Sequence, residues 1–139
     1  MYKQILLAAD GSEHSIRTAK HAVELASLQE KAQITVIYVI DSDTSKHDVL
    51  EVGDQQTVEA KRQSRLKPIE DILEQAHVDY EVEITKGEPG PTIVKFANEH
   101  NFDLVIIGSR GLNVLQEMVL GSVSHKVAKR AKCPVMIVK

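Results

Sequence analysis

The sequence predicts a single α/β domain in which an open parallel sheet of five strands is covered by helices on both faces. The first observation is an alternation along the chain, in which short apolar runs are followed by longer segments with apolar residues at helical spacing. The second is that most of these runs are apolar throughout, which is typical of strands buried on both faces of a parallel sheet. Because the 139 residues contain no repeat or linker, we expect one domain over residues 1–139.

The first elements follow this alternation. Residues 5–9 form an apolar run and predict a strand, not a signal peptide. Ser12 predicts the N-cap of the helix that follows. Residues 34–40 are rich in β-branched side chains and predict a second strand, whereas the polar residues 42–54 predict a loop. The apolar positions of the expected first helix are Ile16, Ala19, Val23 and Ala26.

Helical spacing returns between Val58 and Ala76. Pro68 lies inside this stretch, and we expect it to kink the helix or to split it near residue 67, because proline removes a backbone hydrogen bond. Apolar and polar residues then alternate from Val78 to Thr85, which predicts a half-exposed strand at the edge of the sheet.

The remaining elements are two helices and two strands. Gly90-Pro91 predicts a helix start with Pro91 at the first helical position. Residues 104–107 predict a central strand, and residues 134–138 predict a final strand. Between them we expect a helix with Val123, Val127 and Ala131 on its inner face and Lys129, Arg130 and Lys132 in its last turn.

Composition argues against several classes of protein. A net charge of -3 argues against a nucleic-acid binder, and no apolar run approaches the roughly 20 residues of a membrane span. The single cysteine, Cys133, cannot form an internal disulfide, so we expect a reducing cytoplasm. The six histidines show no HxxxH or HExxH pairing, so we expect no metal site built from protein ligands.

Ligands of open parallel sheets bind at the carboxyl ends of the strands, where the strand order reverses. The loop after residue 107 is the most informative one there, because Gly108, Gly111 and Gly121 are followed by Ser122. Glycines allow the backbone to approach a ligand closely, and helix-start amides with the Ser122 and Ser124 hydroxyls offer donors to an anion. The spacing therefore predicts a cradle for a polyphosphate.

Other interpretations of these residues stay open. The glycines are also common turn residues, Asp10 at a strand end is also a common cap or turn residue, and the serines also cap helices. Arg110 either neutralises phosphate charge or is a solvated loop residue. Neither GxxxxGK[ST] nor GxGxxG is present, so a P-loop NTPase and a dinucleotide dehydrogenase lose most of their support.

The chain resembles the universal stress protein family, in its nucleotide-binding branch, over essentially its whole length. The family's motif of Gly, two residues, Gly, nine residues and Gly-[Ser/Thr] is matched without a gap by Gly108, Gly111, Gly121 and Ser122. The other matching segments are Asp10-Gly11-Ser12, Tyr38-Val39-Ile40-Asp41, Gly87-Glu88-Pro89 and the closing stretch 133–138.

This resemblance implies an ATP-binding domain with a Rossmann-like, adenine nucleotide alpha hydrolase-like fold and the strand order 3-2-1-4-5. That order reverses between the first and fourth strands and places Asp10 and Gly108 across one crevice. Ala8-Ala9 departs from many relatives, which carry a proline or hydroxyl residue there, and this bears on the adenine side. By the family pattern, Asp10 contacts the adenosine part, the Val39 backbone contacts adenine, Gly108 and Gly111 lie against ribose and phosphate, and Gly121 and Ser122 hold the phosphates, assisted by Ser124.

We therefore expect a cytoplasmic, ATP-binding universal stress protein that acts as a nucleotide-dependent module in a stress response. We expect binding and not catalysis, because no Ser-His-Asp or Cys-His pairing is evident, with slow ATP hydrolysis or autophosphorylation left open. An ATP-cleaving or adenylyl-transferring enzyme and a nucleotide-free interaction module are the alternatives. Mg²⁺ is expected, if at all, through phosphate oxygens. The expected partner is a second copy, paired through the apolar final strand at the sheet edge, with neither nucleic acid nor membrane.

Overall fold

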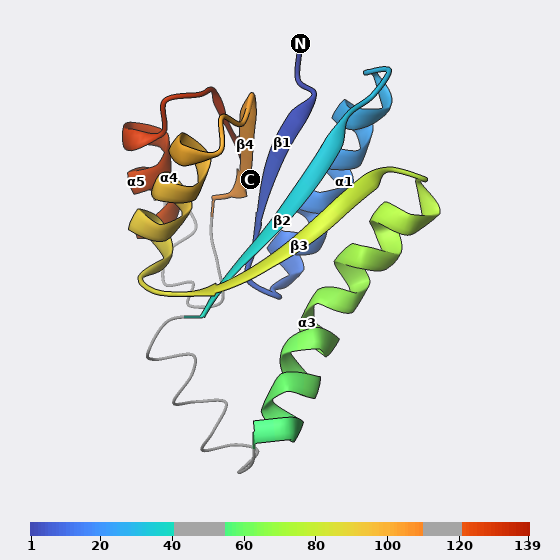
Figure 1. Cartoon of the computed structure of the whole chain (residues 1–139), viewed down its shortest axis with the longest axis vertical. Helices are drawn as coiled ribbons and strands as arrows, with labels where there is room; N and C mark the ends of the chain where they lie inside the picture. Colours follow the sequence, from blue (N-terminus) through green and yellow to red (C-terminus); the bar gives the residue numbers. More distant parts are fainter. Residues whose placement is uncertain (41–54, 110–120) are drawn as a thin grey trace.

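The structure is a computed structural model, and it describes residues 1–40, 55–109 and 121–139. Within these ranges the chain forms five strands and four helices, as the alternation predicts (Figure 1). The expected loop at 42–54 lies outside the described residues. The elements are β1 (Gln4–Ala9), α1 (Glu13–Ser27), β2 (Gln33–Ile40), α3 (Gln55–Gln75), β3 (Asp79–Lys86), α4 (Pro89–Glu99), β4 (Leu104–Gly108), α5 (Ser122–Arg130) and β5 (Val135–Val138).

The strands make one parallel sheet in the order β3-β2-β1-β4-β5, which confirms the expected topology. Strand β1 pairs with β2 on one side and with β4 on the other, so the order of the chain reverses at β1. Leu7 marks the register, since it lies opposite Val36 on β2 and opposite Ile106 on β4.

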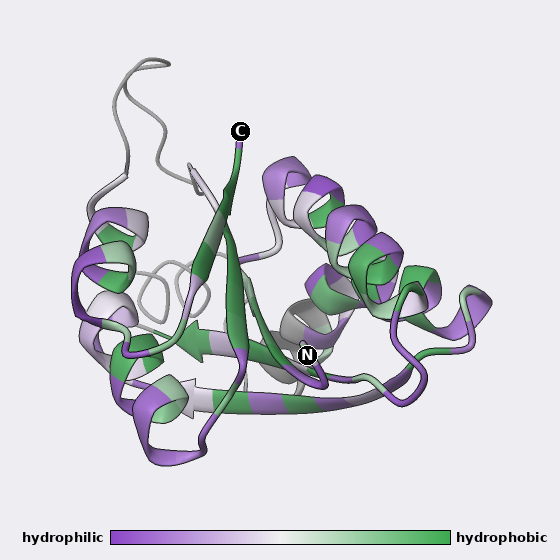
Figure 2. Ribbon diagram, turned by 90° about the horizontal axis from the view of Figure 1, so that it is seen from above, coloured by the Kyte–Doolittle hydropathy of each residue, from purple (hydrophilic) through white to green (hydrophobic). Residues whose placement is uncertain are grey.

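Helices cover the sheet on both faces, as the apolar strands require. Helices α1 and α3 pack on one face, where Leu7 and Val36 meet Ala22 and Leu66. Helices α4 and α5 pack on the other, where Leu6 and Ile37 meet Ile93 and Val127. Figure 2 shows the hydrophobic strands enclosed between helices whose hydrophilic sides face outward. Since Ile5, Leu6 and Leu7 are all fully buried, β1 is the centre of the core.

The two edge strands differ in length and exposure. Strand β3 alternates exposed and half-buried residues over much of its length, which confirms the predicted half-exposed edge. Strand β5 is a four-residue edge on the opposite side, with Val135, Met136 and Ile137 half-buried and Val138 buried. No helix in the described ranges has both the length and the apolarity needed to cross a bilayer.

Helix α3 decides against one of the two outcomes expected for Pro68, because it runs unbroken through this residue and is not split near residue 67. Pro68 lacks the N–H that would donate to the carbonyl of Ser64 four residues earlier. Both residues are exposed, so water can solvate this carbonyl. Packing of Leu66, Ile69 and Leu73 into the core holds the helix together across the missing bond.

Helix α4 also begins earlier than expected, at Pro89 and not at Pro91. Glu88 is its N-cap, so both prolines fall within the first three helical positions, where backbone N–H groups have no partner inside the helix. The last turn of α5 carries Lys129 and Arg130 as predicted, but the helix ends there. Lys132 lies beyond it, and its backbone N–H donates instead to Oδ1 of Asn98 at 2.9 Å.

Replacing Pro68 should show by how much this proline lowers the stability of the protein. Pro68→Ala restores a backbone donor and removes the contact of the ring with the preceding turn, so we expect the free energy of unfolding to rise by about 1–3 kcal/mol. Urea unfolding followed by circular dichroism measures the change. The neighbouring exposed Lys67→Ala is the control and should change stability by less than about 0.5 kcal/mol. A Pro68→Ala protein no more stable than the control would contradict this account.

Candidate functional site

Asp10 organises the loop that follows β1. Its Oδ1 accepts three hydrogen bonds, from the backbone N–H of Ser12 at 2.9 Å, the Ser12 hydroxyl at 2.5 Å and the Ser15 hydroxyl at 2.6 Å. Ser15 Oγ in turn accepts from the backbone N–H of Asp10 at 2.8 Å. Ser12 also caps α1 as predicted, its hydroxyl accepting from the N–H of Ser15. Oδ2 of Asp10 accepts no hydrogen bond from the described residues, which leaves it available to a ligand.

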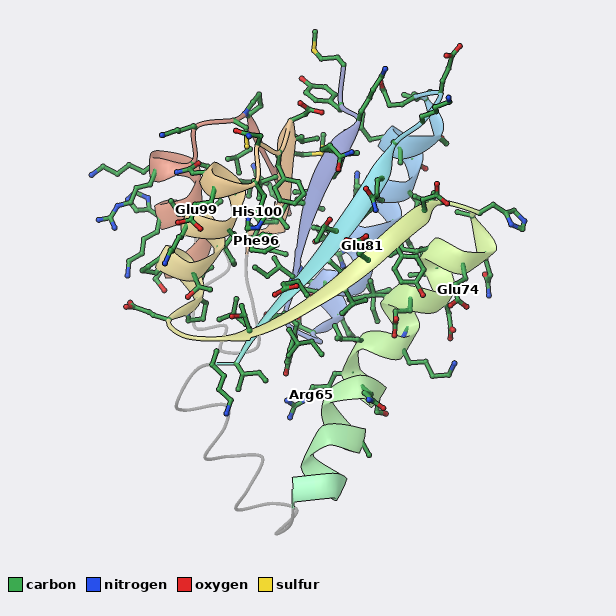
Figure 3. The ribbon with its side chains drawn as sticks, viewed as in Figure 1. Arg65, Glu74, Glu81, Phe96, Glu99 and His100 are labelled. Atoms are coloured by element: carbon green, nitrogen blue, oxygen red, sulfur yellow. The ribbon has the colours of Figure 1, made fainter. Side chains whose placement is uncertain are left out.

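Gly11, next to Asp10, has a backbone conformation that requires glycine. Its φ is +82°, and an added Cβ would lie 2.9 Å from Cβ of Arg65 on α3. Arg65 also donates from Nη1 to the hydroxyl of the buried Tyr38 at 2.9 Å (labelled Arg65 in Figure 3). Helix α3 thus closes against the loop after β1 and the end of β2. Arg65 could not be singled out from the sequence, because nothing local distinguishes it from the other charged residues of α3.

A second junction joins the end of β4 to the start of α5. The backbone N–H of Ser109 donates to the carbonyl of Val138 at 2.8 Å, and its own carbonyl accepts from the N–H of Gly121 at 2.9 Å. The Ser124 hydroxyl lies between both segments, 3.3 Å from the carbonyl oxygen of Ser109 and 3.0 Å from that of Gly121. Gly108 and Gly121 are therefore held near each other, as the glycine spacing anticipates.

The first turn of α5 has backbone N–H groups without a partner among the described residues. Gly121 is its N-cap and supplies no side chain to bond the free N–H groups of the first turn. Helix α1 differs, since Ser12 caps it, and so does α4, since Pro89 and Pro91 remove two donors. Among these three helix starts, α5 is the one whose first-turn N–H groups meet neither a side-chain cap nor a proline, although the N–H of Gly121 itself donates to Ser109. An anion is the ligand that such a helix end prefers.

The two junctions lie side by side at the carboxyl edge of the sheet. Leu7 of β1 lies opposite Ile106 of β4, and Asp10 and Ser109 each follow three residues later on these neighbouring strands. The strand order reverses between the same two strands, so this is the crevice in which open α/β sheets bind ligands. The structure thus brings Asp10, Gly108 and the start of α5 to one crevice.

The remaining predicted site residues fall in different places. Val39 is half-buried near the end of β2, opposite Thr85. Ser122 is exposed in the first turn of α5. Ser124 is 2% exposed, and its hydroxyl already serves the junction, so its contribution to a ligand stays a prediction. Gly111 and Arg110 lie outside the described residues.

Two groups away from the crevice have perturbed acidities. Burial raises the pKa of the Cys133 thiol, which favours the unreactive neutral form. Burial, together with hydrogen bonding to Glu74, also raises the pKa of Tyr80. Among residues 1–40, 55–109 and 121–139, no three His, Cys, Asp or Glu side chains come together as a metal-binding group.

Comparison with known proteins gives consistent matches over the whole chain. The model of the universal stress protein family matches residues 1–139. The universal stress protein MJ0531 of Methanocaldococcus jannaschii is 33% identical over 147 residues, covering 100% of this chain and 83% of that protein. The universal stress protein YxiE of Bacillus subtilis is 34% identical over 149 residues, covering 100% of both.

Solved structures agree with these sequence matches. The structure of the hypothetical protein MJ0577 has a TM-score of 0.84 and 31% identity, covering 100% of this chain and 96% of that one. A universal stress protein in complex with cAMP has a TM-score of 0.74 and 26% identity, covering 99% of this chain and 97% of that one.

Removing the Asp10 carboxylate should loosen the loop after β1. In Asp10→Ala, Ser12 and Ser15 lose their shared acceptor, so we expect the free energy of unfolding to fall by about 1–3 kcal/mol. Urea unfolding of the variant and the parent protein measures this change. Asp79→Ala, at the exposed start of β3, is the matched control and should stay within about 0.5 kcal/mol of the parent. Equal stability of the two variants would show that the Asp10 bonds do not hold this loop.

Proposed function

The chain belongs to the universal stress protein family, and from this premise we propose that it binds ATP at the carboxyl edge of its sheet. We further propose that it acts by binding, as a nucleotide-dependent module of a stress response. A ligand stabilises the conformation that binds it more tightly, so ATP bound in the crevice would change which partners the protein binds. The site is the crevice between the loop after β1 and the start of α5.

One observation carries this proposal. The uncapped N-terminus of α5 stands at the point where the strand order reverses, and the Gly121 N–H bond to Ser109 holds it there. Free first-turn amides and the positive end of the helix dipole stabilise a bound phosphate. The opposite wall supplies Oδ2 of Asp10, an acceptor suited to a ribose hydroxyl. A nucleotide carries both groups, a phosphate for the start of α5 and a ribose hydroxyl for Asp10.

The proposed contacts involve both sides of the crevice and the end of β2. Asp10 would bind the adenosine part, the backbone of Val39 would meet adenine, and Gly121 with Ser122 would hold the phosphates. Gly108 and Gly111 would leave room for ribose and phosphate, with Ser124 supporting the helix start. Mg²⁺ would be bound through phosphate oxygens, and we assign it no protein ligand.

The family provides independent support for an adenine nucleotide. The universal stress protein solved with cAMP has the same fold at 26% identity and carries an adenine nucleotide with a single phosphate. ATP is the finer proposal, and it rests on the spacing of Gly108, Gly111, Gly121 and Ser122, which predicts a cradle for a polyphosphate.

Calorimetric titration with ATP, GTP and adenosine tests this function, with product analysis of the same samples. We expect ATP to bind more tightly than GTP and to remain intact over the titration. Rapid release of AMP or ADP would favour an ATP-cleaving enzyme. No binding of any of these ligands would favour a nucleotide-free interaction module.

The Ser122 hydroxyl should matter for phosphate and not for adenosine. Ser122→Ala removes a donor worth about 0.5–1.5 kcal/mol, so we expect ATP to bind roughly 2- to 12-fold more weakly while adenosine is unaffected. Ser27→Ala, at the far end of α1, is the control and should change neither affinity. Equal losses for ATP and adenosine in Ser122→Ala would contradict the proposed orientation.

We also propose a homodimer through β5. The N–H groups of Val105 and Ser109 donate to the carbonyls of Pro134 and Val138, and bonded residues alternate in a parallel ladder. The backbone groups of Val135 and Ile137 therefore point away from β4, toward the open edge. A second copy related by a two-fold axis would satisfy these groups and cover the apolar side chains.

The backbone of Ile137 tests this dimer. Sedimentation at micromolar concentration should give about twice the mass of one chain for the parent protein. Ile137→Pro should shift it to a monomer or to aggregates, because it removes an outward-facing donor without removing a bond to β4. Ile137→Val keeps the donor and should remain dimeric. A parent protein that sediments as a monomer would rule out this arrangement.

A further inference from the structure

A cavity lies on the open face of β2 and β3 beside α4. Its volume is about 220 Å³. Gln4 and Gln33, the first residues of β1 and β2, line it, so it belongs to the amino-terminal half of the sheet. Figure 1 shows this half of β2 and β3 free of a covering helix on the side of α4. The cavity therefore shares no residue with the proposed nucleotide site.

The floor of this cavity is acidic. Glu81 and Glu83 are separated by one residue on β3, so both carboxylates project from the same face of the strand. Thr35 of β2 lies opposite Glu81 in the register and projects from that face too. The lining contains neither lysine nor arginine, so these two negative charges are not neutralised by the cavity itself. A ligand here would supply positive charge.

Thr35 gives an independent indication of a ligand. It is 8% exposed and lines the cavity, yet its hydroxyl makes no hydrogen bond to any described residue. Among the described residues no buried side-chain nitrogen or oxygen lacks a hydrogen-bond partner, so the Thr35 hydroxyl oxygen is itself accessible, and the cavity that Thr35 lines is where a ligand can reach it. A donor placed in the cavity would bond this hydroxyl.

Aromatic rings form the wall on the α4 side. Phe96 and His100 are stacked with their ring centres 4.2 Å apart, and the Phe102 ring lies 5.7 Å from that of Phe96. Nδ1 of His100 lies 3.0 Å from the carbonyl oxygen of Phe96, so it carries the proton and donates there. Figure 3 shows Glu81 on β3 across the open face from Phe96 and His100 on α4. Aromatic faces and carboxylates together suit a flat cation.

We propose that this cavity binds a guanidinium group, with its N–H donors on Glu81, Glu83 and Thr35 and its plane against the rings of Phe96 and His100. A guanidinium matches the site in three ways. It is positive, it presents five donors to the acceptor-only carboxylates of Glu81 and Glu83, and its planar shape stacks on aromatic rings. The group would belong either to a small free cation or to an arginine side chain of another protein.

Calorimetric titration of the full chain with agmatine and with the blocked peptide acetyl-Gly-Arg-Gly-amide tests this proposal. We expect binding in the millimolar range or tighter, weakened by added salt, since the site is open to solvent. The probe that binds more tightly identifies the source of the guanidinium. Putrescine has amines of similar reach without a guanidinium, and we expect it to bind several-fold more weakly.

Variants separate the cavity from its surroundings. Glu81→Gln/Glu83→Gln should weaken agmatine by about tenfold or more, because it removes both charges and keeps the shape. Thr35→Val should weaken agmatine several-fold without lowering the thermal stability, since the hydroxyl has no internal bond to lose. Glu99→Gln, on α4 and outside the cavity lining, is the matched control and should leave agmatine binding unchanged. ATP affinity should be the same in all of these proteins.

Three results would overturn the proposal. One is no binding of agmatine or the peptide by the parent protein up to about 10 mM. Another is undiminished agmatine binding in Glu81→Gln/Glu83→Gln, which would place the cation elsewhere. The third is putrescine or Mg²⁺ binding as tightly as agmatine and displacing it, which would make the site a general cation site. None of these outcomes bears on ATP, so the two proposals stand or fall separately.

Discussion

Strand β1 is buried on both faces, and this burial determines where the helices and the other strands can lie. A fully buried parallel strand needs helices above and below, and crossovers between parallel strands are right-handed. Winding from β1 through β2 to β3 therefore places α1 and α3 on one face of the sheet. The chain then returns across β1 and winds the other way to β4 and β5, which places α4 and α5 on the opposite face. The reversal at β1 that creates the crevice is a consequence of covering both faces.

Much of this arrangement could be predicted from the sequence because the relevant signals are local. Continuous apolar runs mark buried strands, and Ser12 marks the start of α1 by its ability to cap it. The glycine spacing identifies the turn after β4 and the start of α5. These signals act within a few residues, so neither the packing of α3 nor the sheet order had to be known to recognise the elements. The strand order itself came from the family resemblance, since periodicity does not determine which strands are neighbours.

The features that could not be predicted all depend on packing between distant segments. Pro68 is tolerated because neighbouring turns of α3 are anchored in the core, which outweighs a local preference to break. Arg65 acquires its place from the approach of α3 to Gly11, a contact between residues 54 positions apart in the sequence. Thr35 looked like an ordinary strand residue, and only the position of α4 leaves its hydroxyl beside a cavity.

The hydrogen bonds around Asp10 lower the free-energy cost of ordering this side of the crevice when a ligand binds. The carboxylate is already fixed through Oδ1 by Ser12 and Ser15 before any ligand arrives, and the backbone of Gly11 lies close to the side chain of Arg65. A ligand that meets Oδ2 therefore finds a group whose rotamer is already selected, and it loses little free energy in ordering that side of the crevice. This wall therefore acts as a rigid template, which is already in place when the ligand arrives.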